Sequence, residues 1–412
     1  EGAKWFVNWA DTPHVYALPD GSLWAHWLRS TGPSRMDYGI DLVRSGDGGA
    51  TWSAPQLVHP SGTPGDHGFV TFWPQARDRL GIAWLDSRQK AAAGHAGHDD
   101  GGHDHGGGAA MMLRAATYDV QARQQGEWPL DVSTCDCCTT SSAVTDRGVV
   151  VVYRGRGAGE IRDTRIVRFD GERWTAPRDV HADGWQIAGC PVNGPMTVAD
   201  GATVWVAWYT EADGAPELRA ARSDDAGDTF GAPVTLAKGM QVLGRLGLAR
   251  GDGHLLVSWL EQAQDERQTL VLGRYDDAWA GAQRVDVATL SVRGRASGIP
   301  RLQWHGDAAW LAWTDVAGGA PRLQGARVVF PWCDGVRHFG ASDLDVPSRI
   351  KSRGDPLVRL PPTDAAAGLA GGAADGARTV GHTLGGQCRH AGAGWLDRAV
   401  HDRRRQVGRY AR

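Results

Sequence analysis

Four of the six cysteines stand in two short segments, where they could bind a metal ion or form disulfides. Cys135, Cys137 and Cys138 lie within four residues, and Cys190 lies in a Gly-Cys-Pro segment. Thiolates are the soft ligands that select Cu(I) and Zn(II), and three or four convergent thiols are what such a site needs. We therefore predict a metal site held by these cysteines, with copper as the first choice and zinc as the second.

The same cysteines also allow a disulfide interpretation. Cys190 can pair with one member of the cluster, whereas a bond between Cys135 and Cys137, or between Cys137 and Cys138, closes a very small and strained ring. Alternation along a strand would place Cys135 and Cys137 on one side and Cys138 on the other. A mixed case, with one disulfide and a redox-switched metal site, stays open as well.

A histidine-rich insertion supports the metal hypothesis. Residues 89–110 are rich in Gly, Ala and Asp and contain four histidines, His95, His98, His103 and His105. Such a segment can bind Cu(II), Zn(II) or Ni(II) with little geometric demand, and the alternative is a solvated linker without a ligand. His67 is a further candidate ligand.

The strands that must position these groups recur along the chain. An apolar run that ends in an aromatic residue occurs six times, with the aromatic residues at Trp27, Trp84, Tyr153, Trp208, Trp259 and Trp313. Successive aromatic positions are 57, 69, 55, 51 and 54 residues apart. A period near 50 residues with strand-like units is typical of a β-propeller, in which each repeat forms one blade.

We therefore predict an all-β fold, a six-bladed β-propeller of four-stranded antiparallel blades over residues 1–332. The insertion 89–110 belongs to the second blade, and we expect residues 5–7 to supply the last strand of the sixth. Residues 333–412 show little strand alternation and are predicted to form an irregular tail of unknown role.

The repeat also predicts the face on which each group lies. In a four-stranded blade, the connection to the next blade and the loop between the second and third strands share one face. The cysteine segments precede the first strands of the third and fourth blades, and residues 89–110 follow a second strand. We expect all three at the mouth of the central channel. Charged residues that follow the second strands are predicted to be a solvated rim, namely Asp86, Arg88, Arg154, Arg156, Glu211, Glu261 and Asp315.

Two turns share the pattern Ser-x-Asp-x-Gly-x-Thr followed by Trp or Phe. They consist of Ser45, Asp47, Gly49, Thr51 and Trp52, and of Ser223, Asp225, Gly227, Thr229 and Phe230. The carboxylate can accept backbone N–H groups across the turn, and glycine permits a positive φ. The pattern resembles the Asp box, or BNR repeat, of sialidase-like propellers. With its Cys-x-Cys-Cys motif, the chain resembles uncharacterised sialidase-like proteins of the bacterial envelope.

The sialidase resemblance implies a hydrolase site with three arginines, a Tyr–Glu pair and an aspartic acid/base. Residues 8–14, where the first arginine is expected, contain no arginine. Tyr209 with Glu211 is the nearest Tyr–Glu pair, but it falls in the fourth blade and not late in the propeller. The resemblance therefore carries over the fold and the Asp boxes without catalytic residues.

Composition narrows the classes of partner. The net charge of −3 gives no reason to expect nucleic acid, and no apolar run approaches the ~20 residues of a membrane span. A start at Glu1 suits a mature, processed chain, and the resemblance implies a periplasmic or secreted protein. We predict a non-catalytic propeller that binds a soft metal. The alternatives are an exo-sialidase-type glycoside hydrolase, and a scaffold for a glycan or an envelope protein with structural disulfides only.

Overall fold

The computed structural model describes residues 4–63, 65–92, 110–263, 267–291, 294–316, 319–329 and 336–340. The chain divides into two compact units, Glu1–Arg327 with His338–Leu344, and Val328–Arg337 with Asp345–Arg412. The first unit holds five complete blades and most of the sixth. Nearly all of the second unit lies outside the described residues, so the tail predicted over residues 333–412 is described only at 336–340.

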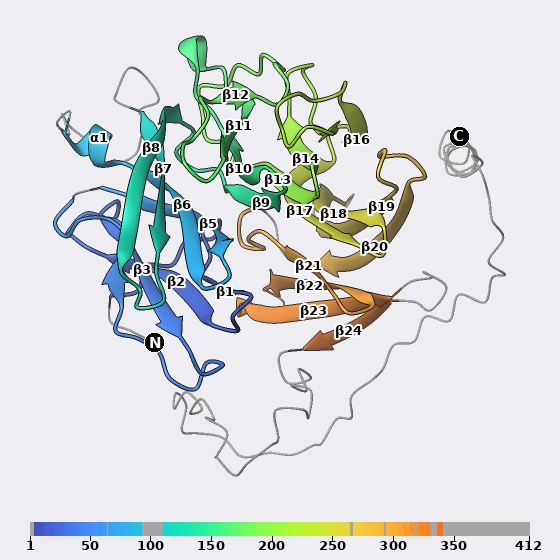
Figure 1. Cartoon of the computed structure of the whole chain (residues 1–412). Coiled ribbons are helices and arrows are strands. Elements are labelled where there is room, and N and C mark those ends of the chain that lie inside the picture. Colours follow the sequence, from blue (N-terminus) through green and yellow to red (C-terminus); the bar gives the residue numbers. More distant parts are fainter. Residues whose placement is uncertain are drawn as a thin grey trace, which may run out of the picture. The chain divides into compact units, whose positions relative to one another are not determined.

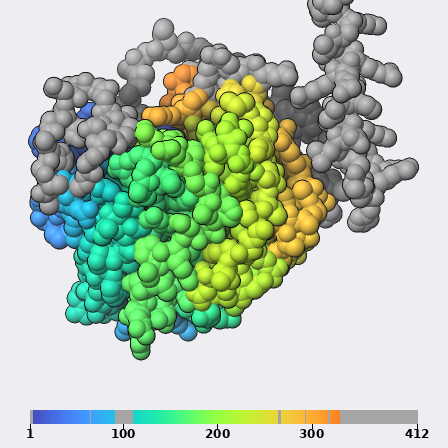
Figure 2. Space-filling model, turned by 90° about the horizontal axis from the view of Figure 1, so that it is seen from above, coloured from blue at the N-terminus to red at the C-terminus, as the bar shows by residue number. Residues whose placement is uncertain are grey.

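Six four-stranded antiparallel sheets follow one another along the chain, which confirms the predicted six-bladed propeller (Figure 1). In each sheet the strands pair in sequence order. The first strand of each blade lies toward the centre of the ring, where β5 contacts β9, β9 contacts β13, β13 contacts β17 and β17 contacts β21. Figure 2 shows the residues of blades 3, 4 and 5 as neighbouring bands from green to yellow.

The first three blades contain the strands β1 His14–Ala17, β2 Leu23–Ser30, β3 Tyr38–Ser45 and β4 Gln56–Leu57; β5 His67–Ala76, β6 Arg79–Asp86, β7 Met111–Tyr118 and β8 Gln124–Thr134; and β9 Ser141–Thr145, β10 Gly148–Arg154, β11 Thr164–Phe169 and β12 Arg178–Asp179. A short helix α1, Arg88–Ala92, follows β6, and a 3-10 turn η1, Ala158–Glu160, follows β10. No helix among the described residues is long and apolar enough to cross a membrane.

The last three blades contain β13 Met196–Asp200, β14 Thr203–Thr210, β15 Glu217–Ser223 and β16 Val234–Lys238; β17 Val242–Gly251, β18 His254–Gln262, β19 Gln268–Tyr275 and β20 Gln283–Leu290; and β21 Arg301–His305, β22 Ala308–Asp315, β23 Arg322–Val329 and β24 Val336–Gly340. The outermost strand of blade 6 therefore comes from the region predicted as an irregular tail.

The second strands show why the sequence forms blades. In β14, Val206 and Trp208 belong to the apolar cluster shared with blade 3, whereas Trp205 belongs to the cluster shared with blade 5. Successive side chains of a strand point to opposite faces, so a run of β-branched and aromatic residues fits a strand covered on both sides. This burial explains why each repeat reads as one continuous apolar run.

The N-terminal segment does not complete blade 6, so that prediction is wrong. Trp5 pairs with Arg29 of β2, and the N–H of Phe6 donates to the carbonyl of Leu28 at 3.0 Å. Trp5 also stacks on Trp27 with 5.9 Å between the ring centroids. Aromatic packing against blade 1 therefore holds this segment beside β2.

Two faces of the propeller can be distinguished by their connections. The loops that join the last strand of one blade to the first strand of the next are here called inter-blade loops, and they define the loop face. The turns between third and fourth strands, such as the β3–β4 turn, lie at the opposite strand ends because paired strands are antiparallel. They define the turn face.

Candidate thiol site

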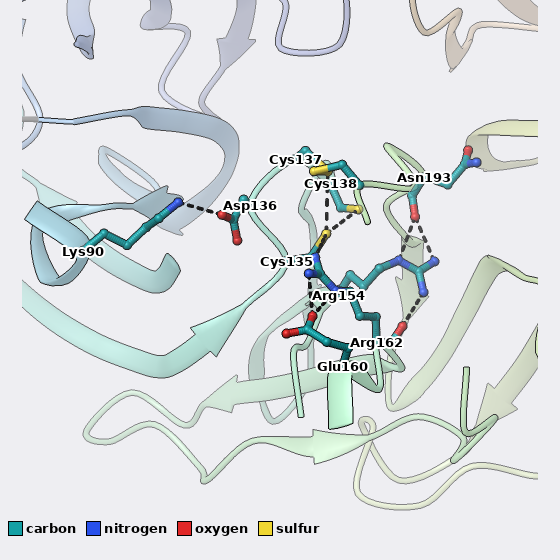
Figure 3. Close-up of a disulfide and its surroundings, with 10 residues drawn as sticks. Lys90, Cys135, Asp136, Cys137, Cys138, Arg154, Glu160, Arg162 and Asn193 are labelled. Carbon is teal, nitrogen blue, oxygen red and sulfur yellow. Dashed lines mark hydrogen bonds and ion pairs between the residues drawn. A yellow bond between two sulfur atoms is a disulfide. The ribbon is translucent and has the colours of Figure 1, made fainter. Parts of the chain in front are cut away.

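The cysteines lie in two inter-blade loops on the loop face. Residues 135–138 belong to the β8–β9 loop, and Cys190 belongs to the β12–β13 loop. These loops lead into β9 and β13, the inner strands that contact each other. A disulfide between Cys137 and Cys190 joins the two loops, so the predicted proximity of the two segments is confirmed (Figure 3).

The four sulfur atoms occur in two states side by side. Cys137 and Cys190 are bonded, whereas Cys135 and Cys138 are free thiols. The Sγ atom of Cys135 lies 3.0 Å from Sγ of Cys138 and 3.7 Å from Sγ of Cys137. The free pair is only 1% and 2% exposed, and the disulfide is half-buried. The site thus combines a buried dithiol with a more accessible disulfide.

The predicted alternation of the cysteines along a strand is wrong. Residues 136–137 form a turn, and β9 begins only at Ser141. The turn brings Cys138 back toward Cys135, so these two sulfurs are closer than those of Cys135 and Cys137. The N–H of Cys135 donates to the carbonyl of Arg154 at 3.0 Å, which fixes the start of the turn to blade 3.

Only part of the predicted ligand set comes together. The ligand atoms of Cys135, Cys137 and Cys138 lie within 4.8 Å of one another, and the described part of the chain holds no other such group of three. His67 lies elsewhere, with Nδ1 3.3 Å from Asp86 Oδ2 and its ring stacked on His59. The histidines of the insertion, His95, His98, His103 and His105, lie outside the described residues.

Arginine residues make the surroundings of the free thiols electropositive. Nη1 of Arg162 lies 3.4 Å from Sγ of Cys135, and its carboxylate partner, Glu160, is shared with Arg156. Burial raises the pKa of Cys135, but the S–H of Cys138 and the charge of Arg162 outweigh it and hold this pKa below the usual range. Burial and the neighbouring Cys135 raise the pKa of Cys138. These opposite shifts favour the thiolate at Cys135 and the proton on Cys138.

Arg154 was predicted to belong to a solvated rim, but it is 2% exposed. Its guanidinium donates to the carbonyls of Arg162 at 2.6 Å, Tyr209 at 2.7 Å and Asn193 at 2.8 Å. It therefore ties blade 3 to blade 4 directly beside the thiols. The sequence carries no signal for this burial, because the accepting carbonyls lie up to 55 residues away.

The root of the histidine-rich insertion contacts the cysteine segment. Nζ of Lys90 in α1 lies 2.7 Å from Oδ2 of Asp136, whose side chain points away from the sulfurs (Figure 3). Gln89 donates to the carbonyl of Val132 at 3.4 Å. The predicted position of residues 89–110 on the thiol-bearing face is therefore consistent with the described start of the insertion.

The disulfide packs into an apolar cluster at the inter-blade loops. Cys137 and Cys190 contact the cluster that includes Phe69 and Val192, and Trp9 packs against the same cluster. These residues precede or begin the inner strands of different blades. Phe69 and Val192 have positive φ angles of 54° and 51°, which residues other than glycine rarely adopt. Contacts between the loops therefore hold backbone conformations that no loop would adopt alone.

Two equivalent hydrogen bonds stabilise these strained loops. Oδ2 of Asp11, before β1, accepts the N–H of Phe69 at 2.7 Å, and Oδ1 of Asn193, before β13, accepts the N–H of Arg245 at 2.6 Å. Each bond joins one blade to the next. Burial raises the pKa of Asp11 to about 7, against the lowering effects of the Phe69 bond and the charge of Arg301. The side chain of Asn193 makes the equivalent hydrogen bond without a charge.

The two patterned turns lie on the turn face and share one hydrogen-bond pattern. In the first, Asp47 Oδ1 accepts the N–H of Thr51 at 2.9 Å, and Ser45 Oγ accepts the N–H of Gly49 at 2.9 Å. The second repeats these bonds with Asp225 and Thr229 at 2.8 Å and with Ser223 and Gly227 at 2.9 Å. Trp52 Nε1 donates to the carbonyl of Gly49, and Phe230 packs against the core between blades 3 and 4.

Hydrogen bonds also set the pKa of both turn carboxylates. Bonds from the hydroxyl and N–H of Thr51 lower the pKa of Asp47 to about 2. Burial raises the pKa of Asp225, but the bonds from Thr229 and Ser223 together outweigh it and lower the pKa to about 2 as well. Both turns are therefore held by ionised carboxylates at neutral pH.

Comparison with known proteins identifies similar folds but no family for this chain. No family model matches the chain, and no curated protein matches it. The GH93 α-L-arabinofuranosidase of Fusarium graminearum is 11% identical with a TM-score of 0.50, over 80% of this chain and 95% of that chain. A protein of unknown function from Dyadobacter fermentans DSM 18053 is 15% identical with a TM-score of 0.48, over 79% of this chain and 95% of that chain.

The phage phi92 endosialidase is also similar, at 12% identity and a TM-score of 0.41, over 86% of this chain and 70% of that chain. Identities this low bear on architecture alone. The chain shares its propeller fold with the arabinofuranosidase, and a shared fold does not transfer a site.

Proposed function

We propose that this propeller binds a soft metal ion, Cu(I) in the first place, through the thiols of the β8–β9 loop. The observation that carries the proposal is the cluster of Cys135, Cys137 and Cys138, with a fourth sulfur, Cys190, bonded to one of its members. Cys135 and Cys138 supply two thiols at once, and reduction of the disulfide adds the others. Soft thiolate sets of this kind select Cu(I) and Zn(II).

Sulfur spacing supports a shared metal. Two thiolates on one tetrahedral zinc ion, the second choice of metal, with bonds of about 2.3 Å would lie roughly 3.8 Å apart. Cys135 and Cys137 are separated by 3.7 Å, which is close to this spacing, whereas Cys138 is nearer at 3.0 Å and must move outward to ligate. The reduced site therefore needs only local adjustment.

Charge favours Cu(I) over Zn(II). With two thiolates, Cu(I) forms an anionic complex and Zn(II) a neutral one. Arg162 lies beside Cys135, and Arg154 is buried in the same place. A net negative complex interacts favourably with these guanidinium groups, whereas a neutral one gains less. The histidine-rich insertion, which begins at the Lys90–Asp136 contact, would capture metal or deliver it.

A titration of the full-length chain under anaerobic conditions tests the proposal. We expect the reduced protein to take about one equivalent of Cu(I) from a chromophoric chelator. Its affinity for Cu(I) should exceed both that of the oxidised protein and its own affinity for Zn(II). The Cys135→Ser/Cys138→Ser variant should lose this binding, and the matched Cys333→Ser/Cys388→Ser variant should keep it. Equal Cu(I) uptake by the wild type and Cys135→Ser/Cys138→Ser would overturn the proposal.

The two alternative functions find less support. Tyr209 donates to Glu211, but Tyr209 is buried in the apolar cluster between blades 4 and 5. Trp84 donates to Asp86 and Trp259 donates to Glu261 in the same way, each to a carboxylate two residues later. Such a pair is therefore a recurring feature of strand ends. Absence of turnover of a fluorogenic sialoside at high enzyme concentration would dismiss the sialidase alternative.

A scaffold with structural disulfides only requires all four clustered cysteines to be paired. Cys135 and Cys138 are free thiols, which argues against this alternative. The Cys137–Cys190 disulfide favours an oxidising compartment, so we infer a periplasmic or secreted location. The matching hydrogen bonds of the two turns favour their identification as the Asp boxes of a sialidase-like propeller.

A further inference from the structure

The thiol site places a nucleophile beside a bond that it can attack. Sγ of Cys135 lies 3.7 Å from Sγ of Cys137, which is bonded to Cys190, and 3.0 Å from Sγ of Cys138. A thiolate attacks a disulfide at one sulfur and expels the other. All the sulfurs needed for such a reaction, in the required redox states, are therefore present in this molecule.

We propose that the Cys135/Cys138 dithiol and the Cys137–Cys190 disulfide exchange within the molecule, so that the protein passes reducing equivalents from a buried cysteine pair to a more accessible one. This inference goes beyond metal binding and does not depend on it. The second state contains a Cys135–Cys138 disulfide with Cys137 and Cys190 as thiols.

Two displacements complete the exchange. The thiolate of Cys135 attacks Sγ of Cys137, a Cys135–Cys137 bond forms, and Cys190 leaves as a thiolate. Cys138 then transfers its proton to Cys190 and attacks Sγ of Cys135, and Cys137 leaves as a thiolate. One disulfide, one thiolate and one proton are present before and after, so no external oxidant or reductant is required.

The surroundings support each step. The guanidinium of Arg162 lies 3.4 Å from Sγ of Cys135 and stabilises an anionic sulfur there. The Cys135–Cys137 bond closes a small ring and is strained. This strain favours its replacement by the Cys135–Cys138 bond, which closes a larger ring. Residues 136–137 form a turn that already holds Cys135 and Cys138 together.

The two cysteine pairs differ in their accessibility to external reagents. Cys135 and Cys138 are 1% and 2% exposed, so an external thiol or disulfide cannot reach them directly. Cys137 and Cys190 are half-buried and are the sulfurs that such a reagent meets first. After exchange, the accessible dithiol can reduce an external disulfide, which becomes two thiols as the Cys137–Cys190 bond forms again.

Alkylation of the native protein tests the proposal. Full-length Cys333→Ser/Cys388→Ser protein, kept metal-free with a chelator, is treated with iodoacetamide, then unfolded, reduced and labelled with heavy iodoacetamide before mass spectrometry. We expect the first label on Cys137 and Cys190 and the heavy label on Cys135 and Cys138, which a disulfide protects until the reduction step. Cys135→Ser should abolish this labelling. Cys138→Ser should stop after the first step, with the first label on Cys190 and the heavy label on Cys135 and Cys137.

Absence of the first label from Cys137 and Cys190 would overturn the proposal, whether or not Cys135 and Cys138 are labelled, as would equal labelling of Cys190 in the presence and absence of Cys135. If Cys135→Ser does not fold, the label pattern of the parent protein and of Cys138→Ser still decides the matter. Because no metal is present, the result is independent of the Cu(I) titration, and either proposal can fail alone.

Discussion

The turn of residues 45–52 and the loop face are stabilised in different ways. In the turn of residues 45–52, the serine, aspartate and threonine side chains bond to groups at most four residues away. On the loop face, Arg154 and Asp11 bond to groups up to 55 and 58 residues away. The turn of residues 45–52 is thus a local unit, whereas these bonds of the loop face exist only when neighbouring blades are assembled. The turn of residues 223–230 keeps the same local bonds, but Arg168 and Arg178 of blade 3 also bond to it.

Removal of Arg154 should break the loop face most severely. Arg154→Leu leaves the buried carbonyls of Arg162, Asn193 and Tyr209 without their donor. We expect the free energy of unfolding, measured in urea, to fall by about 4 kcal/mol. The matched control Arg123→Leu removes an arginine whose side chain is 71% exposed and should change it by less than about 1 kcal/mol. Similar losses for both variants would contradict the comparison.

Asp11→Asn should strengthen the loop face at high pH. The pKa of Asp11 rises from its ordinary 3.8 to about 7 on folding, so the native state binds more protons than the unfolded state. Stability is therefore unaffected below pH 3.8 and falls as pH rises toward 7, because ionisation is easier in the unfolded chain. Asparagine keeps the bond from Phe69 without the charge.

We expect Asp11→Asn to raise the free energy of unfolding by about 3 kcal/mol at pH 8 and by little near pH 4. Parallel urea titrations at the two pH values measure this. The opposite change, Asn193→Asp, removes the donor to the carbonyl of Leu243 and should destabilise the protein at pH 8. A gain from Asp11→Asn that is equal at both pH values would show that charge is not the cause.

Ser45→Ala should have the smallest effect, because it disturbs one local unit. The hydroxyl accepts the N–H of Gly49 and donates to Asp47. Its loss should cost about 1 kcal/mol, and Ser223→Ala should cost the same. The two losses should add in the double variant, since the turns share no partner. A cost of Ser45→Ala that approaches that of Arg154→Leu would mean that the turn of residues 45–52 is not a local unit.

The sequence allowed prediction of whatever repeats or bonds locally. The six apolar runs predicted the blades, and the blade positions predicted that Cys190 lies beside the segment of residues 135–138. The partner of each cysteine was not predictable, because the turn at residues 136–137 breaks strand alternation. The burial of Arg154 was missed for the same reason as the Asp11–Phe69 bond, since both depend on packing between blades.

The Cys137–Cys190 disulfide has a mechanical consequence. The four strands of blade 3, β9 to β12, lie between these cysteines, so the bond encloses an entire blade in a covalent ring. When the molecule is pulled at its two ends, the chain between Cys137 and Cys190 cannot extend. This sequence separation of 53 residues corresponds to roughly 180 Å of contour length at about 3.4 Å per residue. In the Cys135–Cys138 isomer the ring shrinks to one turn, and blade 3 becomes extensible. Movement of one covalent bond would thus decide whether a sixth of the propeller can be stretched.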